Sequence, residues 1–477
     1  MNNTLRNIIT TCTTTLLALA VWADSERLPI LRVNFPGKFT ADMDYIQGTM
    51  SLEDEHGKVV ELSAKFKTRG ATALDYSMKP SFNMKLREAD DTERDSSLLG
   101  LRSCSSWILD AMAIDQICMR NRVSFDIWNS FSLLPYPTEF NGRNGTVGRF
   151  VEVYINNEYT GIYCLNDRIN RKLLNLKKVK TGAEGDTIRG VLYKHGTTDI
   201  ADQNTPGFFN DYSVCVVEWH DAWELTFPED NACEEVWAPL LEYNKNKANY
   251  TYIKDHFFLD NLVDYTLFVM ALSIGDNWGN KNKYFSMRNM RKAEDGRACF
   301  TVTPWDLDTS FGGSYNGTYY GGNYSKWPVS SVISSASPPF STCVRQTEFK
   351  QMLRERWMDL RQYELSIDSV ARRLYEYCDL FYTTGAWQRQ QEWMSKLKYK
   401  PKHCADLRSE VNLVVQWYQD RFAMLDEYFG IEATSIESVL PNGTSPHGNT
   451  YYDLQGRKIT NPQKGQLYIK NKSKVIY

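Results

Sequence analysis

The sequence predicts an α+β protein with a β-rich N-terminal lobe, a mainly helical C-terminal lobe and a small β tail. Polar and apolar residues alternate over 59–67 and 81–86, as in strands with one buried face. Apolar residues instead recur every three or four positions over 407–430, the spacing of one helix face. Of the 477 residues, 42% are apolar and 24% charged, which is globular composition and excludes disorder, collagen and a long coiled coil.

The charge balance makes nucleic acid an unlikely class of partner. Lys and Arg number 55 against 58 Asp and Glu, a net charge of -3, without the basic excess that binding to a phosphate backbone needs. Aromatic residues make up 13% of the chain. Such a fraction favours large cores, although stacking surfaces for sugars use the same residues.

The N-terminus has the pattern of a secretory signal peptide over residues 1–23, a weakly apolar stretch that ends in small residues. The mature chain is therefore expected to be secreted, periplasmic or on the cell surface. Nine of the ten cysteines follow this leader without any C-x-x-C, so we expect buried thiols or one or two disulfides. Residues 257–275 are apolar but contain Asp260 and Asp264, which predicts a buried helix and no membrane span.

Residues 24–170 are expected to form the β-rich N-lobe with one long helix. A glycine-bearing turn at 69–72 joins the first two predicted strands, and its backbone N–H groups, assisted by Arg69 or Lys79, could approach an anion. Mixed three- and four-residue spacing predicts the helix over 106–131, with Asp115 as a cap.

A hairpin is predicted at the end of this lobe. The apolar-rich runs 150–155 and 159–165 flank Asn156-Asn157, and asparagine tolerates the left-handed backbone that a tight hairpin turn requires.

The rest of the chain divides by composition. Residues 171–235 are expected to be an insertion or a lobe connection, and 236–430 a helical C-lobe that carries a catalytic hairpin. Within that lobe, the stretch 312–341 is long and has no periodicity, which predicts a lid, a binding loop or disorder. A polar linker over 431–450 leads to the β-rich tail, 451–477.

The residues richest in chemistry lie on either side of that catalytic hairpin, whose predicted turn is Glu294-Asp295-Gly296. Centring the turn at 294 places Lys283 opposite Trp305 and Asn282 opposite Asp306. Paired strands lie about 5 Å apart, so Asp276, Asn280 or Asn282, and Asp306 could all reach one centre.

Oxygen ligands without His or Cys suit a hard cation, magnesium or manganese or calcium, and not zinc. The simpler alternative is that Asp306 and Asp308 only cap the loop that follows them.

Six motifs follow one another along the chain: R-G-A-T at 69–72, M-K-P-S-F-N-M-K-L at 78–86, M-R-N-R at 119–122, F-V-E-V-Y-I-N-N-E-Y-T-G-I-Y at 150–163, D-N-W-G-N-K-N at 276–282 and P-W-D-L-D at 304–308. Together, in this order, they resemble the CotH family of spore-coat-type, atypical protein kinases. The resemblance covers about residues 28–430.

This resemblance implies an atypical protein-kinase-like fold that transfers phosphate from ATP, with Mg or Mn, to Ser or Thr of a protein. It implies that Asp276 is the catalytic aspartate and that residues 164–168 are the hinge facing adenine. The implied metal ligands are Asn282, with Asn280 as the alternative, and Asp306 with Asp308. Lys85 is the implied phosphate-contacting lysine, with Lys79 as second choice and Arg69 assisting.

Two other functions stay open. An inactive kinase-like surface scaffold is suggested by Asn166-Asp167, where related sequences tend to carry Glu, and by the lack of a glutamate in 117–131 to pair with Lys85. A sugar-binding protein is suggested by the aromatic residues of 312–341, although no acid pair argues for glycoside hydrolysis. The tail resembles short C-terminal β modules of secreted proteins of Gram-negative anaerobes, which implies possible anchoring at the cell surface.

Overall fold

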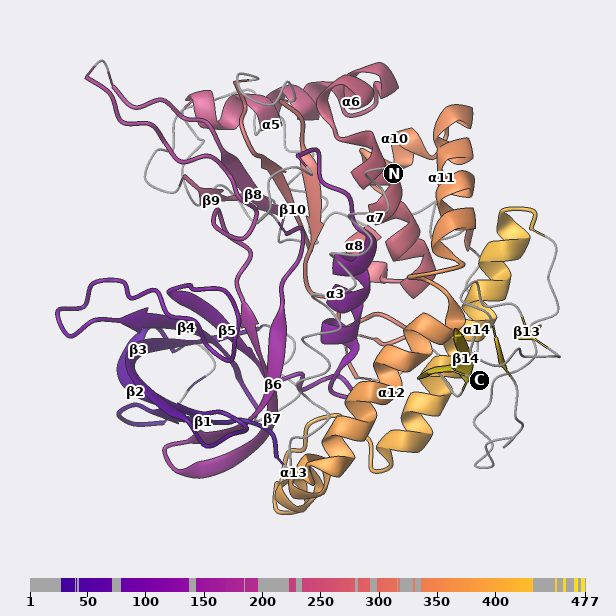
Figure 1. Ribbon diagram of the computed structural model, residues 1–477. Helices are drawn as coiled ribbons and strands as arrows, with labels where there is room; N and C mark the ends of the chain where they lie inside the picture. Colours follow the sequence, from indigo (N-terminus) through magenta and orange to yellow (C-terminus); the bar gives the residue numbers. More distant parts are fainter. Residues whose placement is uncertain are drawn as a thin grey trace. The chain divides into compact units, whose positions relative to one another are not determined.

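The computed structural model divides the chain into two compact units, Met1–Ile431 and Glu432–Tyr477 (Figure 1). The described residues are 27–38, 40, 43–70, 79–136, 143–183, 185–195, 223–228, 234–278, 282–291, 298–314, 316–317, 329–330, 336–431, 451–452, 458–459, 467–470 and 473–476. The predicted signal peptide, the turn at 294–296, most of the proposed lid and nearly all of the linker lie outside them.

The N-terminal part of the first unit is a closed barrel of strands in the order β1-β2-β3-β4-β5-β7-β6. Its strands are β1 (Ile30–Asn34), β2 (Ile46–Glu53), β3 (Val59–Arg69), β4 (Ser81–Arg87), β5 (Ser106–Asp110), β6 (Gly148–Ile155) and β7 (Glu158–Asp167). Antiparallel pairing connects neighbours, and a parallel pair between β1 and β6 closes the barrel. Alternate residues such as Phe66, Phe82 and Met84 fill the interior, as the alternation predicts.

The predicted hairpin is confirmed. β6 and β7 pair antiparallel, and Asn156 and Asn157 join them with φ values of 49° and 67°. Both residues adopt the left-handed backbone of a type I′ turn.

The long helix predicted over 106–131 is wrong in its first half. Residues 106–110 form β5, and helix α3 begins only at Arg120 and ends at Phe131 (Arg120–Phe131). The run Trp107-Ile108-Leu109 is buried within the sheet, and a short apolar run does not distinguish a strand from a helix. Asp115 is not the N-cap residue, which is Met119, but its carboxylate accepts from the backbone N–H groups of Met119 and Arg120 at 2.7 Å each.

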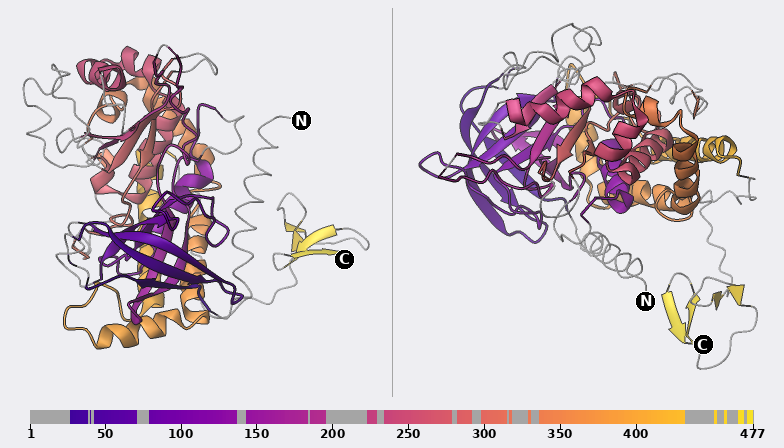
Figure 2. Two further views of the ribbon diagram at one scale, coloured as in Figure 1. Left: turned by 90° about the vertical axis from the view of Figure 1, so that its left-hand side faces the viewer. Right: turned by 90° about the horizontal axis from the view of Figure 1, so that it is seen from above.

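A second sheet has the order β11-β10-β8-β9. Its strands are β8 (Val191–His195), β9 (Trp223–Phe227), β10 (Lys283–Met287) and β11 (Thr301–Pro304). Strands from the segment 171–235 thus extend the hairpin that was predicted to carry the catalytic residues. Figures 1 and 2 show the β4–β5 side of the barrel turned toward this sheet.

The C-terminal part of the first unit is mainly helical, as the sequence predicts. Its helices are α5 (Glu234–Asn246), α6 (Tyr250–His256), α7 (Leu259–Leu272), α8 (Gly275–Trp278), α10 (Phe340–Cys343), α11 (Thr347–Leu360), α12 (Ile367–Thr383), α13 (Ala386–Ser395) and α14 (Leu407–Tyr428). Figure 1 shows α7 among α3, α11 and α14.

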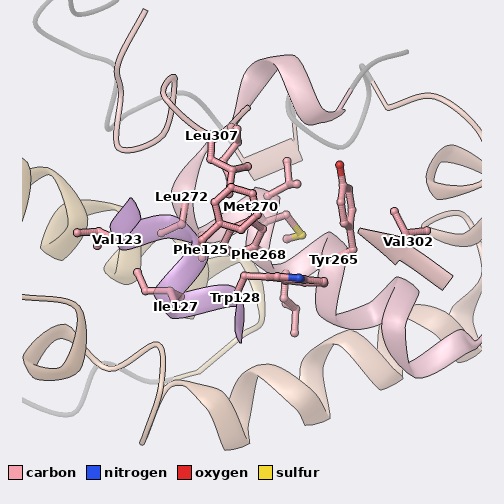
Figure 3. Close-up of a cluster of buried hydrophobic side chains, with 14 of the residues drawn as sticks. Val123, Phe125, Ile127, Trp128, Tyr265, Phe268, Met270, Leu272, Val302 and Leu307 are labelled. Carbon is pink, nitrogen blue, oxygen red and sulfur yellow. The ribbon is translucent and has the colours of Figure 1, made fainter. Parts of the chain in front are cut away.

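Helix α7 is buried along nearly its whole length. In Figure 3 its residues Tyr265, Phe268 and Leu272 pack with Trp128 of α3 in one apolar cluster. Its buried Asp264 is paired with Arg356 at 2.8 Å; burial raises the pKa of this carboxyl to about 6, and Arg356 opposes the rise. The prediction of a buried helix here is confirmed.

No helix of the described residues is long and apolar enough to cross a membrane. The seven cysteines in the described part of the first unit are free thiols. The second unit is a sheet of order β13-β12-β14-β15. Its strands are β12 (Tyr451–Tyr452), β13 (Lys458–Ile459), β14 (Leu467–Lys470) and β15 (Ser473–Ile476).

Candidate functional site

A pocket lies between the outer wall of the barrel, helix α3 and the loop that follows β11. Acidic, amide, basic and apolar side chains from segments far apart in the sequence meet there. Its lining residues are Arg69, Ser81, Ile108, Asp110, Met112, Ala113, Ile114, Asp115, Asn121, Phe125, Thr146, Asn166, Trp305, Asp306 and Asp308.

The D-L-D motif contributes both of its carboxylates to this pocket. Between Asp306 and Asp308, Leu307 is fully buried and joins the core beside Leu272 and Phe125 (Figure 3). Burial of a leucine side chain contributes about 2 kcal/mol. The central leucine therefore anchors the loop and holds the two flanking carboxylates at the pocket.

The backbone of this loop is strained and held in place by specific hydrogen bonds. Asp306 and Asn282 both have φ of 59°, a left-handed conformation that is uncommon for residues with a Cβ, although it costs Asn and Asp less than the roughly 1–2 kcal/mol of other residues. The N–H of Trp305 donates to the carbonyl of Asn282 at 2.9 Å. Strain of this kind clusters at functional sites.

Asn277 connects α8 to Asn282 and to Trp305, the residue before Asp306. Its Nδ2 donates to the carbonyl oxygens of Asn282 and Trp305, at 2.8 Å each, and its side chain is fully buried. The backbone of α8 therefore lies beside the loop that carries Asp306. Asp276 precedes Asn277 on α8, but its side chain lies outside the described part of the chain, as does all of Asn280.

The predicted register of the hairpin is wrong by one residue. Lys283 pairs with Pro304, so the pairing continues to Asn282 opposite Trp305 instead of Asp306. The connection between the strands spans 288–300, and β11 starts at Thr301 instead of Cys299. The one-residue shift leaves Asn282 in contact with the backbone next to Asp306.

Asp110 and Asn121 also line the pocket, although the sequence prediction gave neither a role. Nδ2 of Asn121 donates to Oδ2 of Asp110 at 2.8 Å, and its Oδ1 accepts from the N–H of Leu307 at 3.2 Å. The one available signal was the position of Asn121 within the M-R-N-R motif.

Asp115 shapes the loop that forms the pocket wall over 111–119. It is 2% exposed, and it accepts from the N–H of Ile117 at 3.1 Å as well as from the two amides at the start of α3. The guanidinium of Arg120 pairs with the same carboxylate and neutralises it. Asp115 is therefore committed to holding the loop.

Of the predicted phosphate-contacting residues, Arg69 lines the pocket. Its guanidinium lies over the ring of Trp305, 5.0 Å from the ring centre, which sets a positive charge beside the D-L-D loop.

Lys79 lies away from the pocket lining and is buried. Its ammonium donates to the carbonyl of Ile162 and lies over the ring of Tyr163 at 4.6 Å. Burial lowers the pKa of Lys79 to about 8. Gln390 of α13 accepts from the N–H of the same Ile162 at 2.7 Å. Lys79 and Gln390 thus bond to the backbone carbonyl and N–H of Ile162, on the part of β7 that does not pair with β5.

Lys85 also lies away from the pocket lining, on the outer face of the barrel. It pairs across the sheet with Lys65 and Ser106, and its ammonium is 4.6 Å from the ring centre of Tyr45. It shares the outward face of β4 with Ser81, which does line the pocket.

The predicted hinge contributes Asn166 to the pocket. Its Oδ1 accepts from Arg122 at 3.1 Å, and its Nδ2 donates to the carbonyl of Cys164 at 3.1 Å. Asp167 is paired with Arg102 at 2.9 Å, while burial raises the pKa of its carboxyl. In α3 the carboxylate of Asp126 pairs with Arg122 and not with Lys85.

The side chains of Lys283 and His195, which lie next to Asn282 in the second sheet, are buried. Burial lowers the pKa of Lys283 to about 7. Burial, together with the charge of Lys283, also lowers the pKa of His195, its partner across β10 and β8. The carbonyl of His195 accepts from the N–H of Asn282 at 2.9 Å.

The donor atoms of the pocket fit a hard divalent cation. Within the described ranges, no three His, Cys, Asp or Glu side chains form a metal cluster. Asp306 and Asp308 nevertheless line one pocket next to the backbone of Asn282. Carboxylate and amide oxygens are ligands that magnesium and manganese accept, and two clustered carboxylates favour a cation between them.

The comparisons with known proteins agree with this geometry. The family described as CotH kinase protein matches residues 66–425, a range that includes β4, α3, α8 and the D-L-D loop. The search of curated proteins found no match. Because the family match covers most of the sequence, the chain belongs to the CotH kinase family.

Proposed function

We propose that this protein is an atypical kinase that transfers the γ-phosphate of ATP to Ser or Thr of another protein. The observation that carries the proposal is the pocket that brings Asp306 and Asp308 together with Arg69, inside the region matched by the CotH kinase family. Phosphoryl transfer depends mainly on positioning and on neutralising charge. A pocket with carboxylates for a metal and a guanidinium for phosphate supports that chemistry.

A magnesium or manganese ion would be held by Asp306 and Asp308, with the amide of Asn282 or Asn280 as a further ligand. When bound, the metal would neutralise the charge of the phosphate oxygens.

The chain's own groups supply orientation and proton transfer. Asp276 would orient the acceptor hydroxyl and accept its proton. Arg69 would contact the phosphate groups, and its position over Trp305 supports giving it this role before Lys85 and Lys79. The apolar side chains of Ile108 and Phe125, with Asn166, offer a surface for the adenine.

Radiolabelled phosphate transfer tests the proposal. The purified protein is incubated with γ-labelled ATP, magnesium or manganese, and a Ser/Thr-rich protein. We expect labelling by the wild type and a decrease on the order of 100-fold in Asp276→Asn and Asp306→Asn. Asp379→Asn serves as the control, because the Asp379 side chain on α12 is 58% exposed and pairs with Arg408 of α14, away from the pocket. Equal labelling by wild type and Asp306→Asn would contradict the proposal.

The location and the acceptor are part of the same proposal. Residues 1–23 favour export, and the tail favours attachment at the surface, so the acceptor is a secreted or surface protein. Cell fractionation and N-terminal sequencing of the mature protein test this, and a cytoplasmic chain that retains residues 1–23 would contradict it.

A non-catalytic scaffold is the second candidate. Two observations favour it: none of the described residues that line the pocket is a lysine, and Asp126, the acid of α3, is paired with Arg122. Thermal melting separates the candidates, because a ligand at 100 times its Kd stabilises by about 2.7 kcal/mol. A shift with ATP and metal favours the kinase, and the absence of any shift favours the scaffold.

A further inference from the structure

Basic side chains cover the outer face of the barrel beside the pocket. Alternate residues of β3 fill the barrel interior, among them Ala64 and Phe66, so the residues between them face outward. We define the basic strip as Lys65, Lys67 and Arg69 of β3, Lys85 of β4, and Arg168, which follows the end of β7. Arg87 lies on the same face of β4 but bonds to the backbone carbonyl of Asp91 and is not counted in the strip.

Two cations of the basic strip lie directly opposite each other. Lys65 of β3 pairs with Lys85 of β4 in the antiparallel register, and like charges in such positions destabilise a sheet by about 0.2–1 kcal/mol. The neighbouring carboxylates, Asp91 on Lys65 and Asp44 on Lys67, are 55% and 85% exposed. Such exposed ion pairs contribute little, so an anionic ligand can replace them.

Arg168 extends the basic strip toward the second sheet. Burial raises the pKa of the hydroxyls of Tyr45 and Tyr284, and the charge of Arg168 opposes that rise at both. Arg168 therefore lies close to each ring. Within the described residues, neither Arg168 nor Arg69 forms an ion pair with a carboxylate.

The basic strip begins at the pocket and continues beyond it. Arg69 lines the pocket and pairs with Ser81 across the sheet, whereas Lys85 lies four residues further along β4. Four residues of a strand span about 13 Å. Arg69 is placed to contact the phosphates of a nucleotide, and the cations further along are placed to contact a longer anionic chain. The net charge of the whole protein is -3, so this local excess of cations is not a general property of its surface.

We propose that the basic strip binds an acidic or already phosphorylated segment of the acceptor protein, and so selects acceptors with negative charge near the Ser or Thr. The selection step rests on the proposed kinase function, whereas the binding itself does not require transfer.

Fluorescence anisotropy without nucleotide tests the binding. The probes are two labelled peptides of equal length, one with a serine among glutamates and one with the same serine among lysines. We expect the wild type to bind the acidic peptide and to lose affinity as salt rises. Lys67→Gln and Arg168→Gln should each weaken binding about fivefold, the effect of 1 kcal/mol.

Lys254→Gln is the matched control. Lys254 is 40% exposed and paired with Glu348, much as Lys67 is 44% exposed and paired with Asp44. It should bind the acidic peptide as the wild type does. Equal affinity for the two peptides, or wild-type affinity in both strip variants, would overturn the proposal. Binding of an RNA oligonucleotide but not of the acidic peptide would also overturn it.

The labelling assay separates this proposal from the kinase proposal. If the protein binds the acidic peptide but transfers no phosphate, the kinase proposal is refuted and the proposed binding by the basic strip stands. A protein that labels acidic and basic peptides with equal kcat/KM retains the kinase function and refutes the selection.

Discussion

Asn121 of α3 and Asp110 of β5 are joined by a hydrogen bond of 2.8 Å between the amide nitrogen and a carboxylate oxygen. The other end of the same amide accepts from Leu307, and the other oxygen of Asp110 accepts from the N–H of Met112 at 3.1 Å. One side chain thus links the barrel, α3 and the D-L-D loop. The position of the D-L-D carboxylates relative to the barrel depends on this link.

Asn121→Asp should uncouple these parts of the pocket. The substitution preserves the shape and the acceptor for Leu307 but places a carboxylate against Asp110, and it removes a part-buried hydrogen bond to a charged group, which contributes about 1.5–3 kcal/mol. We expect a lower melting temperature and at least a tenfold loss of phosphate transfer. The control is Asn412→Asp on α14, where an exposed amide accepts from Tyr375 at 2.9 Å. Wild-type transfer by Asn121→Asp would show that the link does not position the loop.

Gly161→Ala should destabilise the barrel where it meets α13. A Cβ at Gly161, where φ is 97°, would lie 2.1 Å from Oε1 of Gln390, the acceptor for Ile162. We expect a loss of about 2–4 kcal/mol, from backbone strain and the broken hydrogen bond together. Urea unfolding measures it. Gly100→Ala separates the two costs, since Gly100 has φ of 74° but nothing within 4 Å of its Cβ position. Equal losses of unfolding free energy in both variants would show that the contact between the new Cβ and Gln390 adds no cost.

Lys79→Met should change how stability depends on pH. The folded pKa of Lys79 is about 8, below the value of about 10.4 in an unfolded chain. Between these values the unfolded state binds a proton that the folded state lacks, so the contribution of Lys79 to the unfolding free energy rises with pH, by up to about 3 kcal/mol. Below pH 8 both states are protonated and this contribution is constant.

The measurement is the unfolding free energy of wild type minus that of Lys79→Met, by urea denaturation from pH 7 to pH 10. Other groups that titrate in this range cancel in the difference. The difference should grow in favour of the wild type as pH rises. A constant difference would mean that the Lys79 ammonium is solvated in the folded protein.

Local patterns in the sequence predicted strands β3, β4, β6 and β7 and the β6–β7 turn, because alternation and Asn-Asn express backbone preferences of nearby residues. The helix predicted over 106–110 was wrong, because an apolar segment buried by tertiary contacts fits either secondary structure. The hairpin register failed by one because thirteen residues connect the strands, and turn chemistry fixes a register only in short connections.

The sequence prediction identified only part of the pocket, namely Arg69, the hinge residue Asn166, and Asp306 with Asp308. Asp306 and Asp308 are two residues apart and were identified together. Asp110 and Asn166 join the pocket because β5 and β7 are neighbours in the barrel, a pairing that no local pattern specifies. Lys79 occurs in a family motif, yet its ammonium serves the edge of β7.

Asn277→Leu should separate the stability of the hairpin from its function when it is compared with Asn261→Leu. Asn277 binds the carbonyls of Asn282 and Trp305 next to the pocket. Asn261 of α7 is equally buried and makes a pair of hydrogen bonds to the backbone of Val302, further along β11. Each substitution removes two hydrogen bonds from buried backbone groups, so both should lower the unfolding free energy by about 2–4 kcal/mol. Only Asn277→Leu releases the strained backbone at Asn282 and Asp306. We therefore expect Asn277→Leu alone to abolish the melting-temperature shift with ATP and manganese, and an equal loss of that shift in both variants would assign the effect to general destabilisation of β11.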